Sequence, residues 1–296
     1  MTDPSPDTAP NSSGTAGPAI PVPAGACDAH MHVLDPRFPT PEASRPAGMT
    51  LGDYRRLQRR LGLTRAVLVQ AKYHSTDHAC LLDGLERLDG KGRGVAVVAP
   101  DVPDAELKRL DAAGVRGLRF SVWNPADTVA TIDSIEPLAA KIAALGWHAQ
   151  IHMSGQQIAE HVDLLGRLPC PIVFDHMARL DPALGPDDPA FGVVARLVER
   201  DRAWVKLSGA YLNTRNGPPG YPDASRVARA FVALAPERLV WGSDWPHVTE
   251  TLRKPDDAVL LDLLASWSGD PAIRDRILVD NPERLYGFAP RSVRQA

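Results

Sequence analysis

The sequence predicts an α/β protein, a single (β/α)₈ barrel of the TIM type. Eight short apolar runs alternate with segments whose apolar residues recur at helical spacing. Several runs are almost continuous in Val, Ile and Leu, as expected for parallel strands covered by helices. The length of 296 residues fits one barrel, because this fold commonly takes about 250 residues. A doubly wound open sheet is the alternative, but its Gly-rich phosphate turn is absent from HVLDPRFP, which follows the first strand.

The strands are expected in the following order along the chain. They are GACDAHMHV from Gly25, RAVLVQA from Arg65, RGVAVVA from Arg93, VRGLRFSV from Val115, WHAQIHM from Trp147, PIVFDHM from Pro171, AWVKLSG from Ala203 and RLVWGSDW from Arg238. Many helical segments between them end in Gly, and several begin after Thr, Asp or Ser, which are the residues that cap helices. A last helix, around NPERLYGF, is expected to close the barrel.

The two ends of the chain differ in composition from the barrel region, 24–289. Residues 1–23 are rich in Pro, Ser, Thr, Gly and Ala, and they lack the basic and apolar regions of a signal peptide. We expect them to form a flexible tail because they bury too little apolar surface to become ordered. Residues 290–296 are expected to form a short C-terminal tail.

Composition excludes several classes of function. The net charge is −3 and no cluster of Lys and Arg forms a stripe, so nucleic acid is not an expected partner. No apolar run approaches the roughly 20 residues that span a membrane. The three cysteines are widely spaced and odd in number, which argues against a disulfide framework and favours a reducing cytoplasm. A small molecule is the expected partner, and the oligomeric state, a homo-oligomer included, stays open.

Histidines and an aspartate fall at the ends of four strands, where barrels of this kind carry their active sites. His30 and His32 stand two residues apart on the first strand, so alternation aims both side chains to the same side. With His152 from strand five and Asp244 from strand eight, they could bind one divalent ion, zinc or manganese. Catalysis without a metal is the competing interpretation, and His176 at the end of strand six joins the site in either case.

Other side chains at the same barrel end are candidates for binding the substrate. Arg119 points inward if strand four alternates like strand one, and Arg179 follows strand six. Two guanidinium groups would suit a substrate carboxylate, which arginine binds bidentately. Tyr211 follows strand seven, and His247 is expected to line the mouth. Asp28, one position of the pleat below His30, is a candidate for orienting the His30 imidazole.

The chain resembles the amidohydrolase superfamily, whose barrels carry His-x-His on strand one, histidines on strands five and six, and Asp on strand eight. The segments CDAHMHV, LVQAKYHSTD, GVRGLRF, PIVFDHM, VWGSDWPH and DNPERLYG resemble the branch that contains pyrone dicarboxylate lactonase, sulfomuconolactone hydrolase, sugar-acid lactonases and galactarolactone isomerase. The similarity runs from about Gly25 to Phe288. It implies a role in breaking down aromatic compounds or sugar acids, and it places a substrate contact at His74.

The resemblance has departures that bear on the metal and on the substrate. Arg119 stands where a Lys or Glu at the end of strand four would bridge two metals, so a binuclear site is not expected. The resemblance to pyrone lactonase implies catalysis without a metal, with a tyrosine where this chain has His152. Because this chain keeps a histidine there, the set of potential metal ligands is restored and a bound metal is again an alternative. Arg119 and Arg179 match arginines of that relative, whereas two further arginine positions fall at or near Asn124 and Leu212. A substrate with one carboxylate, or a hydroxylated lactone, would fit this thinner set.

These features predict hydrolysis of a lactone, with Asp244 as the base that activates water. The histidines His30, His32 and His176, or a metal, would stabilise the oxyanion. A sugar-acid lactone isomerase is one alternative, because Asp244 would then activate a substrate hydroxyl at the same site. A metal-dependent decarboxylase and a non-catalytic binding barrel are the others.

Overall fold

The structure is a computed structural model that describes residues 8–38, 49–124 and 128–290. Eight parallel strands pair in chain order, so the predicted (β/α)₈ barrel is confirmed. The strands are β1 (Cys27–Met31), β2 (Arg65–Val69), β3 (Gly92–Ala96), β4 (Val115–Ser121), β5 (His148–His152), β6 (Ile172–Phe174), β7 (Ala203–Leu207) and β8 (Leu239–Trp241).

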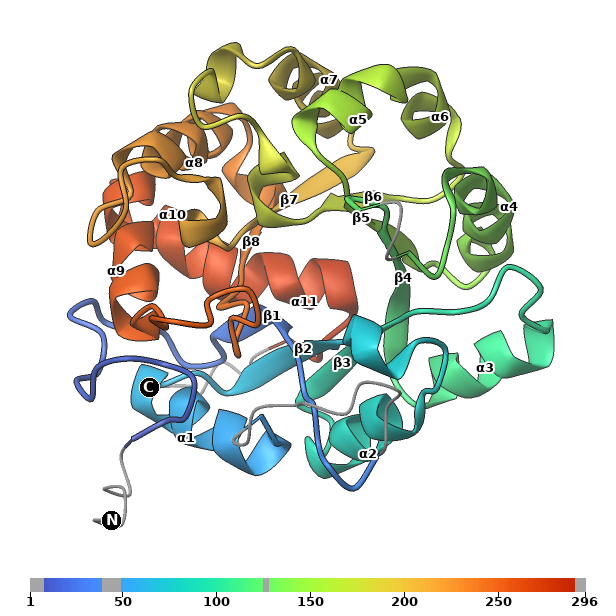
Figure 1. The fold of residues 1–296 in the computed structure, drawn as a ribbon, viewed down its shortest axis with the longest axis horizontal. Helices are drawn as coiled ribbons and strands as arrows, with labels where there is room; N and C mark the ends of the chain where they lie inside the picture. The colour runs from blue at the N-terminus through green and yellow to red at the C-terminus, as the bar shows by residue number, and fades with distance from the viewer. Residues whose placement is uncertain (1–7, 39–48, 125–127, 291–296) are drawn as a thin grey trace.

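The helices form a ring around the strands, running in chain order from α1 through α4 to α9 (Figure 1). They are α1 (Leu51–Leu61), α2 (Ala79–Arg87), α3 (Asp104–Ala112), α4 (Ile132–Ala143), α5 (Gly155–Glu160), α6 (Val162–Arg167), α7 (Pro189–Glu199), α8 (Pro222–Leu234), α9 (Asp257–Ser268), α10 (Pro271–Asp275) and α11 (Asn281–Tyr286). Short 3₁₀ segments η1 (Lys72–His74), η3 (His176–Arg179), η4 (Gly185–Asp187), η5 (Ala210–Asn213) and η6 (Pro236–Arg238), and one π turn, η7 (Arg276–Asp280), lie between them.

Helix α1 illustrates how the sequence sets these elements. Thr50 and Asp53 form a reciprocal capping box at its start, and Gly62 ends it in the left-handed conformation at φ 71°. Leu57 and Leu61 lie buried on one face, at the i, i+4 spacing that faces a sheet.

The barrel closes between the ends of β1 and β8. The backbone N–H of Asp244 donates to the His30 carbonyl (2.8 Å), and the N–H of His32 donates to the Trp245 carbonyl (2.9 Å). At the opposite end, the Tyr286 ring of α11 meets the ring of His148, the first residue of β5, with centroids 5.5 Å apart. Helix α11 therefore closes the N-terminal end of the barrel, and in Figure 1 it crosses the middle of the ring.

Strand β1 contains a bulge that decides which side chains face the site. Its pairing with β2 shifts between Asp28 and Met31, so β1 carries one extra residue there. Cys27 and Ala29 pack in the interior cluster with Trp204 and Tyr286. Beyond the bulge the alternation reverses, which lets His30 and His32 point inward as well.

Strands β6 and β8 are shorter than predicted because the functional residues after them leave the extended conformation. His176 has φ 50° and Asp244 has φ 63°, both in the left-handed region that non-glycine residues rarely adopt. These turns bring both side chains back toward the barrel axis, and such strained positions concentrate at functional sites.

The described part of the predicted N-terminal tail packs on the barrel. The indole N–H of Trp245 donates to the Pro10 carbonyl (2.7 Å), and the Asp262 carboxylate accepts the backbone N–H groups of Ala19 and Ile20 (3.0 Å each). Ala9 is buried. Residues 8–23, which we expected to be flexible, therefore dock on the barrel through hydrogen bonds of their backbone. Such bonds do not require large apolar side chains. Residues 1–7 and 291–296 of the two predicted tails lie outside the described residues.

Helices of the described chain include none long and apolar enough to cross a membrane.

Candidate active site

A cavity of about 280 Å³ opens at the C-terminal ends of the strands. Its wall includes most of the residues that the sequence singled out, namely His32, Arg119, His152, His176, Arg179 and Asp244. The rim adds residues from the loops, among them Lys72, Tyr73, Trp123 and Leu212. These residues therefore share one concavity at the end of the barrel where TIM barrels carry their active sites.

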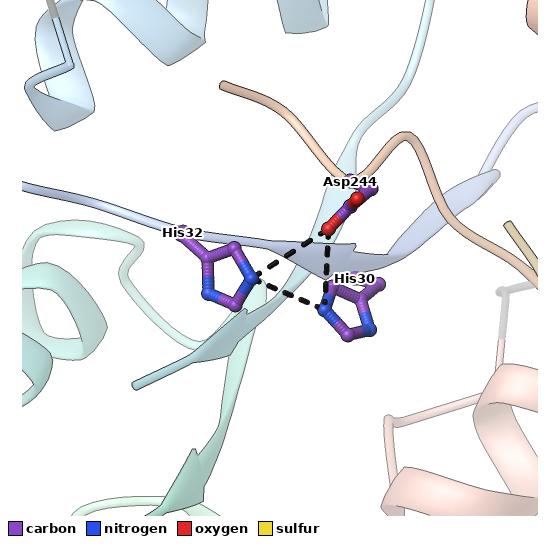
Figure 2. Close-up of side chains that lie close together, drawn as sticks. All are labelled: His30, His32 and Asp244. Carbon is purple, nitrogen blue, oxygen red and sulfur yellow. Dashed lines mark hydrogen bonds and ion pairs between the residues drawn. The ribbon is translucent and has the colours of Figure 1, made fainter. Parts of the chain in front are cut away.

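The centre of the site is formed by His30, His32 and Asp244, which converge (Figure 2). His30 lies in β1, His32 follows the last residue of β1, and Asp244 lies in the turn after β8. The Nε2 atoms of the two imidazoles are 3.2 Å apart. Asp244 Oδ1 lies 3.5 Å from His30 Nε2 and 3.6 Å from His32 Nε2. His176 Nε2 approaches the same oxygen at 3.9 Å. One carboxylate oxygen thus faces three ring nitrogens.

Each group at the centre is held by a partner on its far side. His32 Nδ1 lies 2.8 Å from the Val69 carbonyl, which only accepts, so Nδ1 donates and Nε2 keeps its lone pair. His176 Nδ1 lies 2.9 Å from the Ser208 hydroxyl. The Tyr211 hydroxyl donates to Asp244 Oδ2 at 2.6 Å, which leaves Oδ1 to face the imidazoles.

A buried polar layer beneath His30 was not predicted from the sequence. Lys206 of β7 is fully buried; its ammonium donates to Gln150 Oε1 (2.7 Å) and lies 3.2 Å from His30 Nδ1. Asp175 is also fully buried, and its Oδ2 accepts from Arg119 Nε and from Gln150 Nε2, both at 3.2 Å. The signal was present, since a lysine within AWVKLSG and a glutamine within HAQIH interrupt apolar strands.

Asp28 does not orient the His30 imidazole, contrary to the expectation. Its Oδ1 accepts the backbone N–H groups of His30 (3.1 Å) and Ser243 (2.9 Å), and its Oδ2 accepts the Tyr54 hydroxyl of α1 (3.1 Å). The bulge in β1 causes the difference, because it places Asp28 on the side that faces the helices. Asp28 therefore ties β1 to the loop after β8.

His152 lies on the cavity wall but outside the central group. Among the described residues, two sets offer potential ligand atoms within 4.8 Å of one another, namely His30, His32 and Asp244, and His30, Asp175 and His176. Neither set includes His152. The His152 ring instead meets His176 edge-on at 5.5 Å, and its Nδ1 lies 3.0 Å from the Ser121 hydroxyl. Its Nε2 is buried without a hydrogen bond to any described residue. The structure therefore gives the predicted four-ligand set only three converging members.

The two arginines lie on the wall as expected, each with a partner of its own. Arg179 stacks over Trp123 at 4.0 Å, and its Nη1 donates to the Leu212 carbonyl (3.2 Å). Its Nε has no hydrogen-bond partner among the described residues. Arg119 is tied to Asp175 through Nε, which leaves the end of its guanidinium toward the cavity it lines.

Three predicted substrate contacts lie behind the wall of the cavity. His74 is buried beside a separate cavity of about 10 Å³. Tyr211 turns its hydroxyl to Asp244, and His247, fully buried, places Nδ1 2.9 Å from that hydroxyl and Nε2 3.1 Å from Asp257. None of the three is part of the wall that the described residues form. Strand alternation and loop position predict at which end of the barrel a side chain lies, but not whether it lines the cavity or lies behind its wall.

The electrostatics favour neutral imidazoles around an ionised carboxylate. Burial lowers the pKa of His30 and His152 well below the usual range, and it lowers that of His176 to about 4. Burial alone would raise the pKa of Asp244, but the imidazoles around it, His176 and His32 foremost, hold it well below the ordinary range. At neutral pH, Asp244 is therefore an ionised base beside the neutral imidazoles of His30 and His176.

The central group suits a divalent ion by its chemistry and position. Two imidazole nitrogens and one carboxylate oxygen are ligands typical of zinc, and they converge within 4.8 Å. Three protein ligands also leave positions open for exchangeable ligands, as in catalytic sites.

The barrel and its histidine–aspartate site define an amidohydrolase-type hydrolase fold, and the comparisons agree. The amidohydrolase family model matches residues 27–288, and the chain belongs to this family.

Curated relatives cover almost the whole chain. A 4-sulfomuconolactone hydrolase from Rhizobium radiobacter is 36% identical over 274 residues, covering 90% of this chain and 91% of its own. A 2-pyrone-4,6-dicarboxylate hydrolase from Comamonas testosteroni is 36% identical and covers 91% and 92%. A D-galactarolactone isomerase from Agrobacterium fabrum is 32% identical and covers 94% and 96%. The branch that the sequence predicted is thus confirmed.

Proposed function

We propose that this enzyme hydrolyses a small carboxylated or hydroxylated lactone, with Asp244 activating the attacking water. The observation that carries the proposal is Asp244 Oδ1, which faces His30, His32 and His176 on a cavity lined by two arginines. The relatives named as hydrolases of 4-sulfomuconolactone and 2-pyrone-4,6-dicarboxylate support the same chemistry.

Asp244 is the general base. Its pKa lies well below the usual range, so the carboxylate is ionised at neutral pH and accepts a proton from water at Oδ1. His32 Nε2 lies 3.6 Å from this oxygen, so the His32 ring borders the place of the water and restricts its direction. After attack on the lactone carbonyl, Asp244 returns the proton to the leaving oxygen as the ring opens.

His176 is the donor best placed for the developing oxyanion. When the Ser208 hydroxyl donates to its Nδ1, the ring proton stands on Nε2, which faces the site. A fixed N–H aimed at developing charge is the usual form of oxyanion stabilisation. His30 is fully buried and absent from the described wall, so it acts through Asp244 and His32 as a positioning residue.

Arg119 and Arg179 bind the substrate's carboxylate. Both line the cavity, and Arg179 is held flat against Trp123. A planar guanidinium binds a carboxylate through two parallel hydrogen bonds, which also orients the ring. Leu212, rather than a third arginine, stands on the same wall, so the arginine pair suits one carboxylate, with hydroxyl groups elsewhere on the lactone. The Lys72 ammonium on the rim lies over the Tyr73 ring.

A divalent ion, zinc or manganese, would be held by His30, His32 and Asp244. When bound, such an ion polarises a carbonyl and lowers the pKa of water. Metal-free catalysis uses the same side chains in the roles given above. The three cysteines are free and buried, and we expect the enzyme in the cytoplasm.

A lactone isomerase is the second candidate, since the D-galactarolactone isomerase is 32% identical to this chain. In that reaction Asp244 would take the proton from a substrate hydroxyl, which then attacks the carbonyl in place of water.

The test is a panel of lactones offered to the wild-type enzyme and to Asp244→Asn. The panel holds 4-sulfomuconolactone, 2-pyrone-4,6-dicarboxylate and D-galactarolactone. Turnover is measured as the loss of absorbance of the lactone and as the release of acid. We expect turnover of at least one by the wild type and its loss in Asp244→Asn. Turnover of none, or equal turnover by the variant, would refute the proposal.

A further inference from the structure

The Nδ1 atom of His30 has two neighbours that make opposite demands on it. Lys206 Nζ and Asp175 Oδ1 each lie 3.2 Å away. An ammonium only donates, so it requires a lone pair on Nδ1, whereas a carboxylate only accepts and requires a proton there. The choice between them decides which nitrogen of His30 carries its proton.

The geometry favours Lys206. Its contact with Nδ1 is a hydrogen bond, while Asp175 Oδ1 makes no hydrogen bond with any residue that the structure describes. Asp175 is held by its other oxygen, through Arg119 and Gln150. Lys206 is held in turn by Gln150 at 2.7 Å, so the buried layer fixes both neighbours in place.

The other side of the ring agrees with this assignment. His32 gives its Nδ1 proton to the Val69 carbonyl, so its Nε2 can only accept. His30 Nε2 lies 3.2 Å from that atom, and the pair forms a hydrogen bond only when His30 Nε2 carries a proton. Lys206, His30, His32 and Val69 therefore make one chain in which every donor meets an acceptor.

We propose that Lys206 is a positioning residue that keeps the His30 proton on Nε2 and thereby weakens the binding of a divalent ion at His30, His32 and Asp244. A metal needs the lone pair of His30 Nε2, so its binding must move the ring proton to Nδ1. That N–H would then face the Lys206 ammonium, donor against donor, and the ammonium, 3.8 Å from Asp175 Oδ1, competes for the one oxygen that could accept it. The fixed positive charge beneath the ring also repels a dication.

Replacing Lys206 should therefore strengthen metal binding. In Lys206→Met the chain keeps a side chain of similar length without the charge. Asp175 keeps its bonds to Arg119 and Gln150, and Asp175 Oδ1 can then accept a proton from His30 Nδ1 at 3.2 Å. A histidine that donates to a carboxylate through one nitrogen and binds a metal through the other is the common arrangement in metal sites.

The first experiment measures zinc affinity by competition with a chromophoric chelator at one fixed pH, using full-length protein stripped of metal. We expect Lys206→Met to bind zinc about tenfold to a hundredfold more tightly than the wild type, as loss of one opposed hydrogen bond to a charged group implies. Lys141→Met, the same change on α4, where the ammonium donates to the Val102 carbonyl, should match the wild type. Equal affinities in Lys206→Met and wild type would overturn the proposal.

The second experiment needs no variant at Lys206, so it remains decisive if that variant fails to fold. Long-range ¹H–¹⁵N correlation spectra of the metal-free wild type report which ring nitrogen of each histidine carries hydrogen, and His30→Asn identifies the signals of His30. We expect a proton on Nε2 and a bare Nδ1. A proton on Nδ1 would overturn the proposal. Neither experiment uses lactone turnover, so both outcomes stand apart from the test of the hydrolase.

Discussion

Tyr211 tests whether the site works as the structure describes, because sequence and structure give it different roles. The sequence predicts a substrate contact, whereas its hydroxyl lies behind the cavity wall and donates to Asp244 Oδ2 at 2.6 Å. In Tyr211→Phe this hydrogen bond to an ionised carboxylate is lost. Such bonds contribute about 1.5–3 kcal/mol, so we expect kcat/KM to fall about tenfold to a hundredfold.

The two roles separate in the kinetic constants. Loss of positioning lowers kcat with little change in KM, because Oδ2 of Asp244 becomes free to turn away from the attack direction. The assay is steady-state hydrolysis of the best lactone of the panel. Tyr286→Phe is the matched control, since the Tyr286 hydroxyl at the far end of the barrel has no hydrogen-bond partner among the described residues. A raised KM with unchanged kcat would refute the positioning role and restore the sequence prediction.

Three further predictions concern the base, the clamp and stability. Asp244→Asn should lower kcat by about 10²–10⁴, the usual contribution of a general base, while its circular dichroism stays that of the wild type; retained activity would contradict the mechanism. Arg179→Lys should raise KM for carboxylated lactones about tenfold, because lysine neither stacks flat on Trp123 nor binds bidentately. An unchanged KM would exclude binding of the substrate carboxylate by Arg179. Burial, together with Lys206, lowers the pKa of His148 to about 3, so between pH 7 and pH 5 only the unfolded chain gains this proton and stability is lost. Urea unfolding at both pH values should show that His148→Gln loses about 2 kcal/mol less than the wild type over this interval, and equal losses would refute the assignment.

Much of this architecture could be predicted because it follows from periodicity. Alternating strands and helices predict the barrel, and polar residues at strand ends predict that His32, His176 and Asp244 share one cavity. These features depend on local spacing and on one general property of barrels, that strand ends meet at one face.

The rest depends on features that spacing does not encode. One extra residue in β1 turns Asp28 away from the site while it keeps His30 and His32 inside. Spacing also does not show how far a side chain lies from the cavity. Tyr211 and His247 follow strand ends as Asp244 does, but they lie one layer behind it.

The role of Lys206 depends on three neighbours that come from three other strands or turns, so it could not be predicted from the sequence around Lys206. A lysine inside an apolar strand signals a buried charge, but its partners Gln150, His30 and Asp175 are far away in sequence. Similarly, residues 8–23 carry a composition typical of flexible segments, and their docking is explained by hydrogen-bond donors and acceptors on the barrel, such as the Trp245 indole and the Asp262 carboxylate.

The central claim is that water activated by Asp244 opens a lactone ring. The most direct measurement is turnover of the best panel lactone in water enriched in oxygen-18, with mass spectrometry of the product. The account predicts one oxygen-18 in the new carboxylate of the ring-opened acid. A rearranged lactone without the label would contradict hydrolysis and establish the isomerase instead.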